Sequence, residues 1–393
     1  MPSRILSARL LVNMAIYLDN NATTSLDPRV LDAMLPWMQG VHGNPSSIHH
    51  PGRAARAALD MARAHVAALV NAQAAQVVFT SGGTEADNLA LKGVCHGKSH
   101  SRVLISAIEH AAVLGPAEDL IREGWQVQRI PVDTGCRLDF NALRKMLEEE
   151  VRLVSVMLAN NENGAIQDVK TVAAVARKRG VLMHTDAIQA AGKVSVDFAA
   201  LGVDLMSLSA HKFGGPHGVG ALIVDRGVDL APQITGGGQE HGQRGGTENL
   251  AGIIGFGKAA ELAHLELDTR RRHMHALRND LEAGLLSIPG ISIFAGYTER
   301  LPNTVQLGAD GFDGEFLVME LDKRGIAVSS GSACHSASGQ PSHVLLAMGI
   351  DEVHARSAVR ISFGMQNTVD DVHTLLAALT TIASKRSGAL ALA

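Results

Sequence analysis

The sequence predicts an α/β protein in which a large domain with a mostly parallel sheet is followed by a smaller α+β domain. Short apolar segments alternate with helical patterns between residues 77 and 225, which is typical of a parallel sheet with helices on both faces. The chain of 393 residues is also longer than one hydrophobic core usually supports. A long helical pattern over residues 248–286 then leads into shorter, mixed elements, so we expect it to connect two units.

Seven apolar segments rich in Val, Ile and Leu predict the strands of the large sheet. They lie at residues 76–81, 102–107, 125–132, 151–158, 181–187, 204–210 and 221–225. Helical patterns such as residues 84–94 and 168–180 separate several of them. In such sheets ligands bind at the carboxyl ends of the strands, so we expect the chemistry in the loops that follow them.

The remaining segments predict the smaller α+β unit. Strand patterns lie at residues 291–296, 303–308, 327–330 and 359–363, and helical patterns at residues 314–325, 341–349 and 369–385.

Composition excludes several classes of function. The chain is 46% hydrophobic and 19% charged with a net charge of −4, which is an ordinary globular composition. It contains no basic run for nucleic acid and no apolar run long enough for a membrane span. The three cysteines are odd in number and far apart, which argues against a disulfide framework or a metal site and favours a reducing, cytoplasmic location. We interpret residues 1–13 as an extended start ahead of Met14 rather than a presequence.

Two cysteines fit structural positions. Cys95 lies in an apolar pattern typical of a small buried side chain, and Cys136 lies in a turn-like stretch. Cys334 is different, because it lies among Ser, Ala and Gly in "SSGSACHSASG", residues 329–339.

Two charged residues follow apolar strands and allow two interpretations each. Lys212 precedes a glycine-rich turn and could form an imine with a carbonyl cofactor, or simply extend from a strand end to solvent. Asp186 could bind a protonated pyridine nitrogen, which makes the ring an electron sink, or could cap the helix that we expect after it.

The segment "SGGTEADNLAL" runs from a strand into a helix. Its backbone N–H groups and hydroxyls at residues 81–84 could bind a phosphate. Alternatively, Thr84 is only the N-cap of the helix.

Ten motifs in order identify a family. They are "YLDNNATT", "GNPSSIH", "FTSGGTEADNLAL", "IEHAAVL", "NNENG", "HTDAIQAAGK", "SLSAHKFGGPHGVGAL", "GGGQEHGQRGGTEN", "SSGSACHSASGQPSHVL" and "AVRISFG". Over residues 17 to about 365 the chain resembles the cysteine desulfurases of the NifS and IscS type, closest to the NifS-like branch. These are fold-type-I enzymes dependent on pyridoxal 5'-phosphate (PLP). The resemblance implies a large domain of residues 17–261 with a seven-stranded sheet, and a small domain of residues 1–16 and 262–393.

The resemblance also implies roles for individual residues. Lys212 would hold PLP covalently, Asp186 would pair with the ring nitrogen, and Gln189 would bind the ring hydroxyl. His110 would stack on the ring and move protons, unless it only begins a helix. The phosphate would be held by Gly83, Thr84, Ser209 and His211. Thr247 would reach the phosphate of a neighbouring subunit, which implies a homodimer with shared active sites.

The substrate is implied to be L-cysteine, whose carboxylate Asn161 and Arg360 would bind. The alternative for Arg360 is an ordinary charge at a strand edge. Cys334 would be the nucleophile that takes the sulfur as a persulfide and passes it to an iron–sulfur scaffold or another acceptor protein. The sequence departs from the family pattern at His335, where threonine is usual, and it lacks the longer tail of the IscS-like branch.

Other functions on the same scaffold remain as alternatives. A selenocysteine lyase or an aminotransferase would use the same PLP site, but an aminotransferase has no need for Cys334. A PLP-binding protein without catalysis and a thiol-redox protein are the alternatives from other classes.

Overall fold

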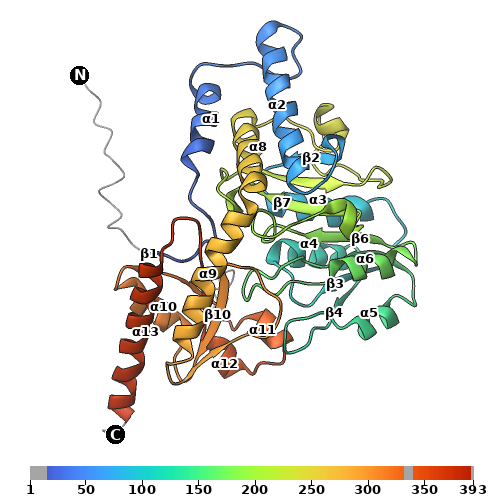
Figure 1. Ribbon diagram of the computed structural model, residues 1–393. Helices are drawn as coiled ribbons and strands as arrows, with labels where there is room; N and C mark the ends of the chain where they lie inside the picture. The colour runs from blue at the N-terminus through green and yellow to red at the C-terminus, as the bar shows by residue number, and fades with distance from the viewer. Residues whose placement is uncertain (1–15, 332–339, 391–393) are drawn as a thin grey trace, which may run out of the picture.

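The computed structural model describes residues 16–331 and 340–390, with side chains as far as Ser384 (Figure 1). Its main sheet has seven strands in the order β2-β8-β7-β6-β5-β3-β4, and all are parallel except β8, which runs antiparallel to both of its neighbours. The strands are β2 Val77–Thr80, β3 Arg102–Ser106, β4 Gln126–Ile130, β5 Val151–Ser155, β6 Leu182–Asp186, β7 Leu205–Ser209 and β8 Gly220–Val224. All seven predicted strands are therefore confirmed.

Helices cover both faces of this sheet. They are α1 Pro28–Gln39, α2 His50–Leu69, α3 Gly83–Cys95, α4 Ala111–Arg122, α5 Phe140–Met146, α6 Val169–Arg177, α7 Phe198–Leu201 and α8 Leu250–Leu265, with short 3-10 turns η2 Ala74–Gln76, η3 Ala210–Lys212 and η4 Gln239–Gly242. The N-cap of α3 is Gly82, so the interpretation of Thr84 as the N-cap is wrong. Likewise no helix follows Asp186, because residues 188–193 form consecutive turns.

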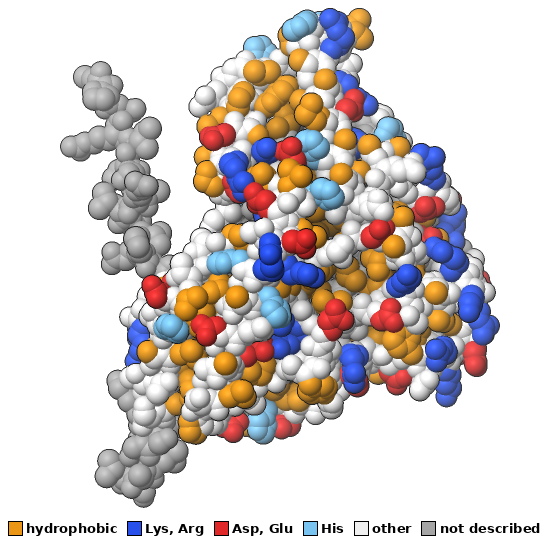
Figure 2. Space-filling view, viewed as in Figure 1, with side chains coloured by type: hydrophobic (Ala, Val, Ile, Leu, Met, Phe, Trp, Pro, Cys, Tyr) orange, Lys and Arg blue, Asp and Glu red, His pale blue; other side chains and the backbone are white. Residues whose placement is uncertain are grey.

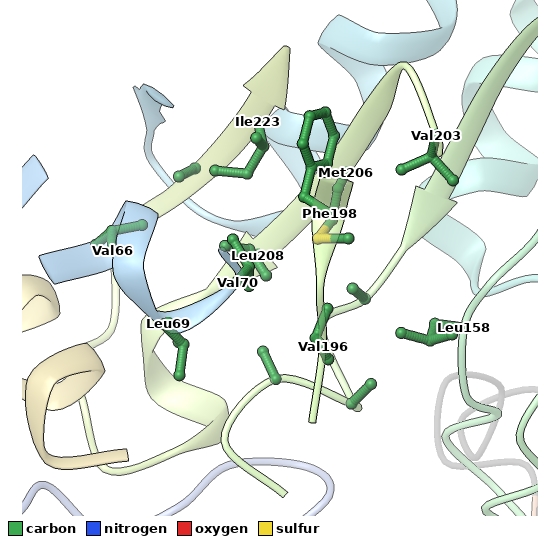
Figure 3. Close-up of a cluster of buried hydrophobic side chains, with 14 of the residues drawn as sticks. Val66, Leu69, Val70, Leu158, Val196, Phe198, Val203, Met206, Leu208 and Ile223 are labelled. Atoms are coloured by element: carbon green, nitrogen blue, oxygen red, sulfur yellow. The ribbon is translucent and has the colours of Figure 1, made fainter. Parts of the chain in front are cut away.

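Alternating side chains of the strands supply two separate cores. Along β7, Leu205 packs with α3 and α4, whereas Met206 and Leu208 point to the opposite face. Figure 3 shows this opposite face, where Met206 and Leu208 belong to the same buried cluster as Val66 and Val70 from α2 and its end. Each large side chain buried in this way stabilises the fold by about 1.5–3 kcal/mol relative to exposure.

The smaller unit is built on a four-stranded antiparallel sheet in the order β12-β13-β10-β9. Its elements are α9 Leu267–Leu285, β9 Ile291–Ile293, β10 Thr304–Ala309, α10 Gly314–Asp322, β11 Ile326–Ala327, β12 Ser329–Ser330, α11 His343–Ala347, α12 Glu352–Arg356, β13 Ala358–Ser362 and α13 Val369–Leu390. These elements enclose a third core, which includes Leu281, Leu307 and Phe363. Figure 1 places α13 along the outer side of this unit.

The predicted long helix at residues 248–286 is two helices, α8 and α9, which meet at Glu266. No glycine or proline marks this break. Instead, Arg29 of α1 and Arg270 of α9 both bind the Glu266 carboxylate, at 2.5 and 2.9 Å. Because α8 packs on α1 and α2 whereas α9 packs on α13, this junction supports a domain boundary close to the one expected at residues 261–262, which stays a prediction.

The segment after β1 (Ile16–Tyr17) joins the two units. β1 pairs in parallel with β11 of the smaller unit. A few residues later, Thr24 and Asp27 donate backbone hydrogen bonds to His211 and Gly214 of the large unit. Residues 18–27 therefore cross the boundary beside Lys212.

Candidate active site

A cavity of about 320 Å³ lies where the main sheet meets the smaller unit. Most of its lining follows the carboxyl ends of strands β2, β3, β5, β6 and β7, which run in the same direction, as expected for a ligand site in a parallel sheet. The lining residues are Asn21, Ala22, Gly83, Thr84, His110, Ala112, Met157, Asn161, Asp186, Ile188, Gln189, Ser209, His211, Lys212 and Arg360. Every site residue predicted from the sequence is among them except Thr247 and Cys334.

Lys212 ends the short turn η3 that follows β7. Its Nζ donates hydrogen bonds to the backbone oxygens of Asn21 and Ala22, at 2.6 and 2.8 Å. The amine is therefore held at the cavity wall by the segment that crosses between the units. It does not extend to bulk solvent, as the alternative interpretation of Lys212 required.

Asp186 ends β6 and is buried. Its Oδ1 accepts a hydrogen bond from the Ile188 N–H at 2.8 Å. Burial raises the pKa of Asp186 to about 6, while the Ile188 N–H and the charge of Lys212 oppose the rise. A cation brought against this carboxylate would remove much of the cost of burying its charge.

A buried polar network lies behind Asp186. The ring of His184 bonds to Ser155 Oγ through Nδ1 at 2.8 Å and to Ser207 Oγ through Nε2 at 3.0 Å. Asp87 Oδ1 lies 3.5 Å from the same Nε2. Burial lowers the pKa of His184 to about 3 and raises that of Asp87 well above its ordinary value. This side of the site therefore holds buried acidic groups, and Lys212 is the cation whose charge acts on Asp186.

The opposite side of the cavity suits an anion. The N-terminus of α3 brings the N–H groups of Gly83 and Thr84 to the cavity, and Gly82 at the N-cap has no side chain to occupy them. Ser209 Oγ is buried and has no hydrogen-bond partner among the described residues, although buried hydroxyls are rarely left so. An anion here would accept hydrogen bonds from this hydroxyl and from the helix start.

His211 completes this wall. Its Nδ1 lies 3.1 Å from Thr23 Oγ1, and its ring stacks on His217 at 5.2 Å between centroids. Burial, aided by the charge of Lys212, lowers the pKa of His211 to about 4. The ring is therefore neutral near pH 7 and carries one N–H donor.

His110 follows β3 and is the N-cap of α4, as one interpretation expected, whereas its stacking on PLP stays a prediction. Its Nδ1 accepts a hydrogen bond from the Ala112 N–H at 3.1 Å as the helix N-cap, and its ring lines the cavity. Burial, reinforced by the charges of Lys212 and His343, lowers the pKa of His110 to about 4. Because Nδ1 accepts a bond, the proton of the neutral ring lies on Nε2.

Arg360 enters the cavity from the smaller unit. It lies on β13, an inner strand of the four-stranded sheet, and is only 2% exposed, so it is not a charge at a strand edge. Its guanidinium donates to Asp19 Oδ1 at 2.6 Å and to the Asn161 backbone oxygen at 3.1 Å. Its Nε is buried without a partner among the described residues. This arrangement leaves donor capacity for a carboxylate.

Two predicted site residues do not line the cavity. Thr247 is exposed and borders a separate small cavity with Ser81 and Gly218. Cys334 lies outside the described residues. Among the described residues, Cys95 and Cys136 are buried, and burial raises the pKa of both thiols to about 12. Cys136 also has a left-handed φ of 63°, which agrees with its predicted place in a turn.

Residue-by-residue reasoning from the sequence missed Asn21 and Ala22. The motif "YLDNNATT" pointed to their segment, but their contribution is made by backbone oxygens, which no residue type reveals. Over the described ranges, no group of three or more His, Cys, Asp or Glu side chains could hold a metal ion. No helix in the same ranges is both long and apolar enough to cross a bilayer.

Comparison with known proteins gives a consistent result. Residues 16–375 match the aminotransferase class-V family. The chain is 46% identical to a cysteine desulfurase of Cereibacter sphaeroides over 93% of this chain and 95% of that protein. Among solved structures, a NifS-like protein superposes with a TM-score of 0.88 at 38% identity, covering 94% of this chain and all of the other. A second, SspA in complex with cysteine, has a TM-score of 0.78 at 30% identity, covering 90% of this chain and all of the other.

Proposed function

The chain belongs to the aminotransferase class-V family, and we propose that the cavity between its two units is where it removes sulfur from L-cysteine. The chain is a cysteine desulfurase, and the enzymes of this family use PLP. One observation carries the proposal. Lys212, Asp186 and Arg360, an amine, a buried carboxylate and a buried guanidinium, line a single cavity.

The cavity fits PLP in size and in chemistry. Its volume of about 320 Å³ is within the range of small-molecule sites. The unpartnered Ser209 hydroxyl and the start of α3 suit the phosphate, with His211 as a further donor. Asp186 suits the protonated ring nitrogen, and the amide of Gln189 suits the ring hydroxyl. When bound, PLP supplies an electron sink for the bonds of the attached amino acid.

Lys212, Asp186 and His110 then have separate roles in binding the cofactor and in proton transfer. Lys212 provides the amine for covalent attachment, and two backbone oxygens fix its direction. Asp186 keeps the ring nitrogen protonated by its negative charge. The neutral ring of His110 carries its proton at Nε2, because its Nδ1 accepts a hydrogen bond at the start of α4.

Arg360 and Asn161 would orient the substrate. The guanidinium is planar and presents several N–H donors, so it can bind both oxygens of an amino-acid carboxylate. Its bonds to Asp19 and to the Asn161 backbone fix the position of that fork before substrate arrives. Asn161 lines the same cavity and is buried.

Cys334 would be the nucleophile. In the register of β12 and β13, Ser329 pairs with Arg360. Cys334 is five residues farther along, so the chain can carry it no more than about 18 Å from Ser329. The thiolate attacks the substrate sulfur, a sulfur–sulfur bond forms and the carbon–sulfur bond breaks. The carbon then takes up a proton and leaves as alanine, while the persulfide stays on Cys334.

We propose a homodimer with shared active sites, and the place of Thr247 supports this proposal. This residue is exposed and does not line the cavity of its own chain, which agrees with a role toward a partner's phosphate. Exposed hydrophobic side chains on and beside α1 and α2, including Met38, Ile48 and Met61, offer apolar area for such contact, and Figure 2 shows hydrophobic side chains over these helices. The persulfide sulfur would pass to an iron–sulfur scaffold or another acceptor in the cytoplasm.

A direct assay tests this function. The protein loaded with PLP and supplied with L-cysteine and a reductant should release alanine and sulfide in equal amounts. Cys334→Ala should abolish sulfide release. If the variant still converts the amino acid at the normal rate, the chain acts as another PLP enzyme, such as an aminotransferase. The same assay is run with L-selenocysteine. Turnover of L-selenocysteine but not of L-cysteine would identify the protein as a selenocysteine lyase instead.

A further inference from the structure

Lys193 is a buried lysine beside the cavity that none of the roles above uses. Its side chain is only 3% exposed. Its Nζ donates to Gln189 Oε1 at 2.7 Å and to Asn21 Oδ1 at 3.0 Å. A buried lysine is costly unless its donors are satisfied by acceptors that need them. Both acceptors belong to residues that line the cavity.

The contacts of Lys193 fix which way the Gln189 amide points. Lysine has only donors, so the amide atom that faces Nζ must be the oxygen. On its other side, Gln189 Nε2 donates to the Asn21 backbone oxygen at 2.9 Å. A flipped amide would place N–H groups against the lysine and an oxygen against a carbonyl. One amide hydrogen therefore remains on Nε2, on the side chain that is expected to bind the ring hydroxyl of PLP.

Asn21 connects the same network to both ends of the site. Its backbone oxygen accepts from Lys212 Nζ as well as from Gln189. Its side-chain nitrogen donates to the Asn161 backbone oxygen at 3.1 Å and to Thr304 Oγ1 at 2.9 Å. Lys193 thus holds the residue that links the cofactor amine to the substrate-binding loop.

We propose that Lys193 is a positioning residue of the PLP site, which holds the Gln189 amide with its N–H edge available to the cofactor and anchors Asn21 beside Lys212. This proposal rests on the proposed function, because it assumes that PLP occupies the cavity. Burial and the nearby charges of Lys212 and Arg360 lower the pKa of Lys193, so its bonds to Gln189 Oε1 and Asn21 Oδ1 are what favour the protonated, donor-only form of this amine.

The test is a double-mutant cycle on PLP affinity. Lys193→Met keeps the length of the side chain but removes its donors, and Gln189→Leu removes the amide. Each single substitution should raise the equilibrium dissociation constant for PLP roughly tenfold, as expected for loss of an oriented hydrogen bond. The double variant should be no weaker than the poorer single variant, because Lys193 acts through Gln189. The visible absorption band of bound PLP should shift in the same direction in both single variants.

Controls separate this role from a structural one. Lys178→Met changes an exposed lysine on the surface and should leave PLP affinity and the absorption band as in the wild type. If Lys193→Met does not fold, the same cycle is run with Lys193→Leu, which also lacks donors. Wild-type affinity in the Lys193 variant, or penalties that multiply in the double variant, would overturn the proposal. A wild-type protein that binds no PLP would instead overturn the proposed function.

Discussion

Replacing Arg360 with glutamine tests how the chain recognises its substrate. The change removes a buried charge whose fork is fixed by Asp19 at 2.6 Å and by the Asn161 backbone at 3.1 Å. Truncating one side of a buried charge pair costs about 2–5 kcal/mol of binding. At about 1.4 kcal/mol for each factor of ten, this predicts a KM for L-cysteine roughly 30- to 4,000-fold higher.

The assay is steady-state alanine formation at saturating PLP, with melting temperatures recorded for each protein. Arg300→Gln is the matched control, because Arg300 is also buried in the smaller unit and pairs with Glu282 at 2.7 Å, but it does not line the cavity. This control should lose stability yet keep the wild-type KM. An unchanged KM in Arg360→Gln would remove Arg360 from the substrate site.

Three other predictions concern the cofactor, the pH dependence and the fold. Lys212→Ala should lose its yellow colour on dialysis, whereas the wild type keeps it, and a variant that stays yellow would contradict covalent attachment through Lys212. The folded protein holds His211 with its pKa lowered to about 4, so it binds fewer protons than the unfolded chain between about pH 4 and 6.5. The stability that this residue contributes should therefore fall as the pH drops through that range. In the cofactor-free protein, the melting temperature should fall less steeply with decreasing pH in His211→Asn than in the wild type. Equal slopes of melting temperature against pH in the two proteins would refute this prediction. Leu208→Ala, at a fully buried position in the core of Figure 3, should cost about 2–5 kcal/mol in urea unfolding, and a loss below 1 kcal/mol would contradict the packing described.

The sequence predicted the main sheet well because most of its strands are continuous apolar runs buried on both faces; the edge strand β4, with the sequence QVQRI, is the exception. It predicted the cavity because residues at the carboxyl ends of parallel strands, such as Asp186 and Lys212, must meet at one edge. Ser209 could be placed only through the family resemblance, since nothing local marks a serine whose hydroxyl lacks a protein partner.

Other features depend on contacts between distant segments. The break between α8 and α9 arises where Arg29 reaches Glu266, and no local breaker marks it. The N-cap of α3 is Gly82 rather than Thr84, because the chain adopts an extended conformation there before the helix begins. Asn21 contacts Lys212 through its backbone oxygen and Lys193 through its side chain. Lys193 contacts Gln189 because residues 188–193 form consecutive turns. Such features follow from tertiary structure rather than from residue type.

The measurement that tests the whole account most directly is mass analysis of the peptide that contains Cys334. After PLP-loaded protein reacts with L-cysteine without a reductant, this peptide should gain one sulfur atom, and the same peptide from Lys212→Ala should not. Alanine that accumulates while the Cys334 peptide stays unmodified would contradict the account.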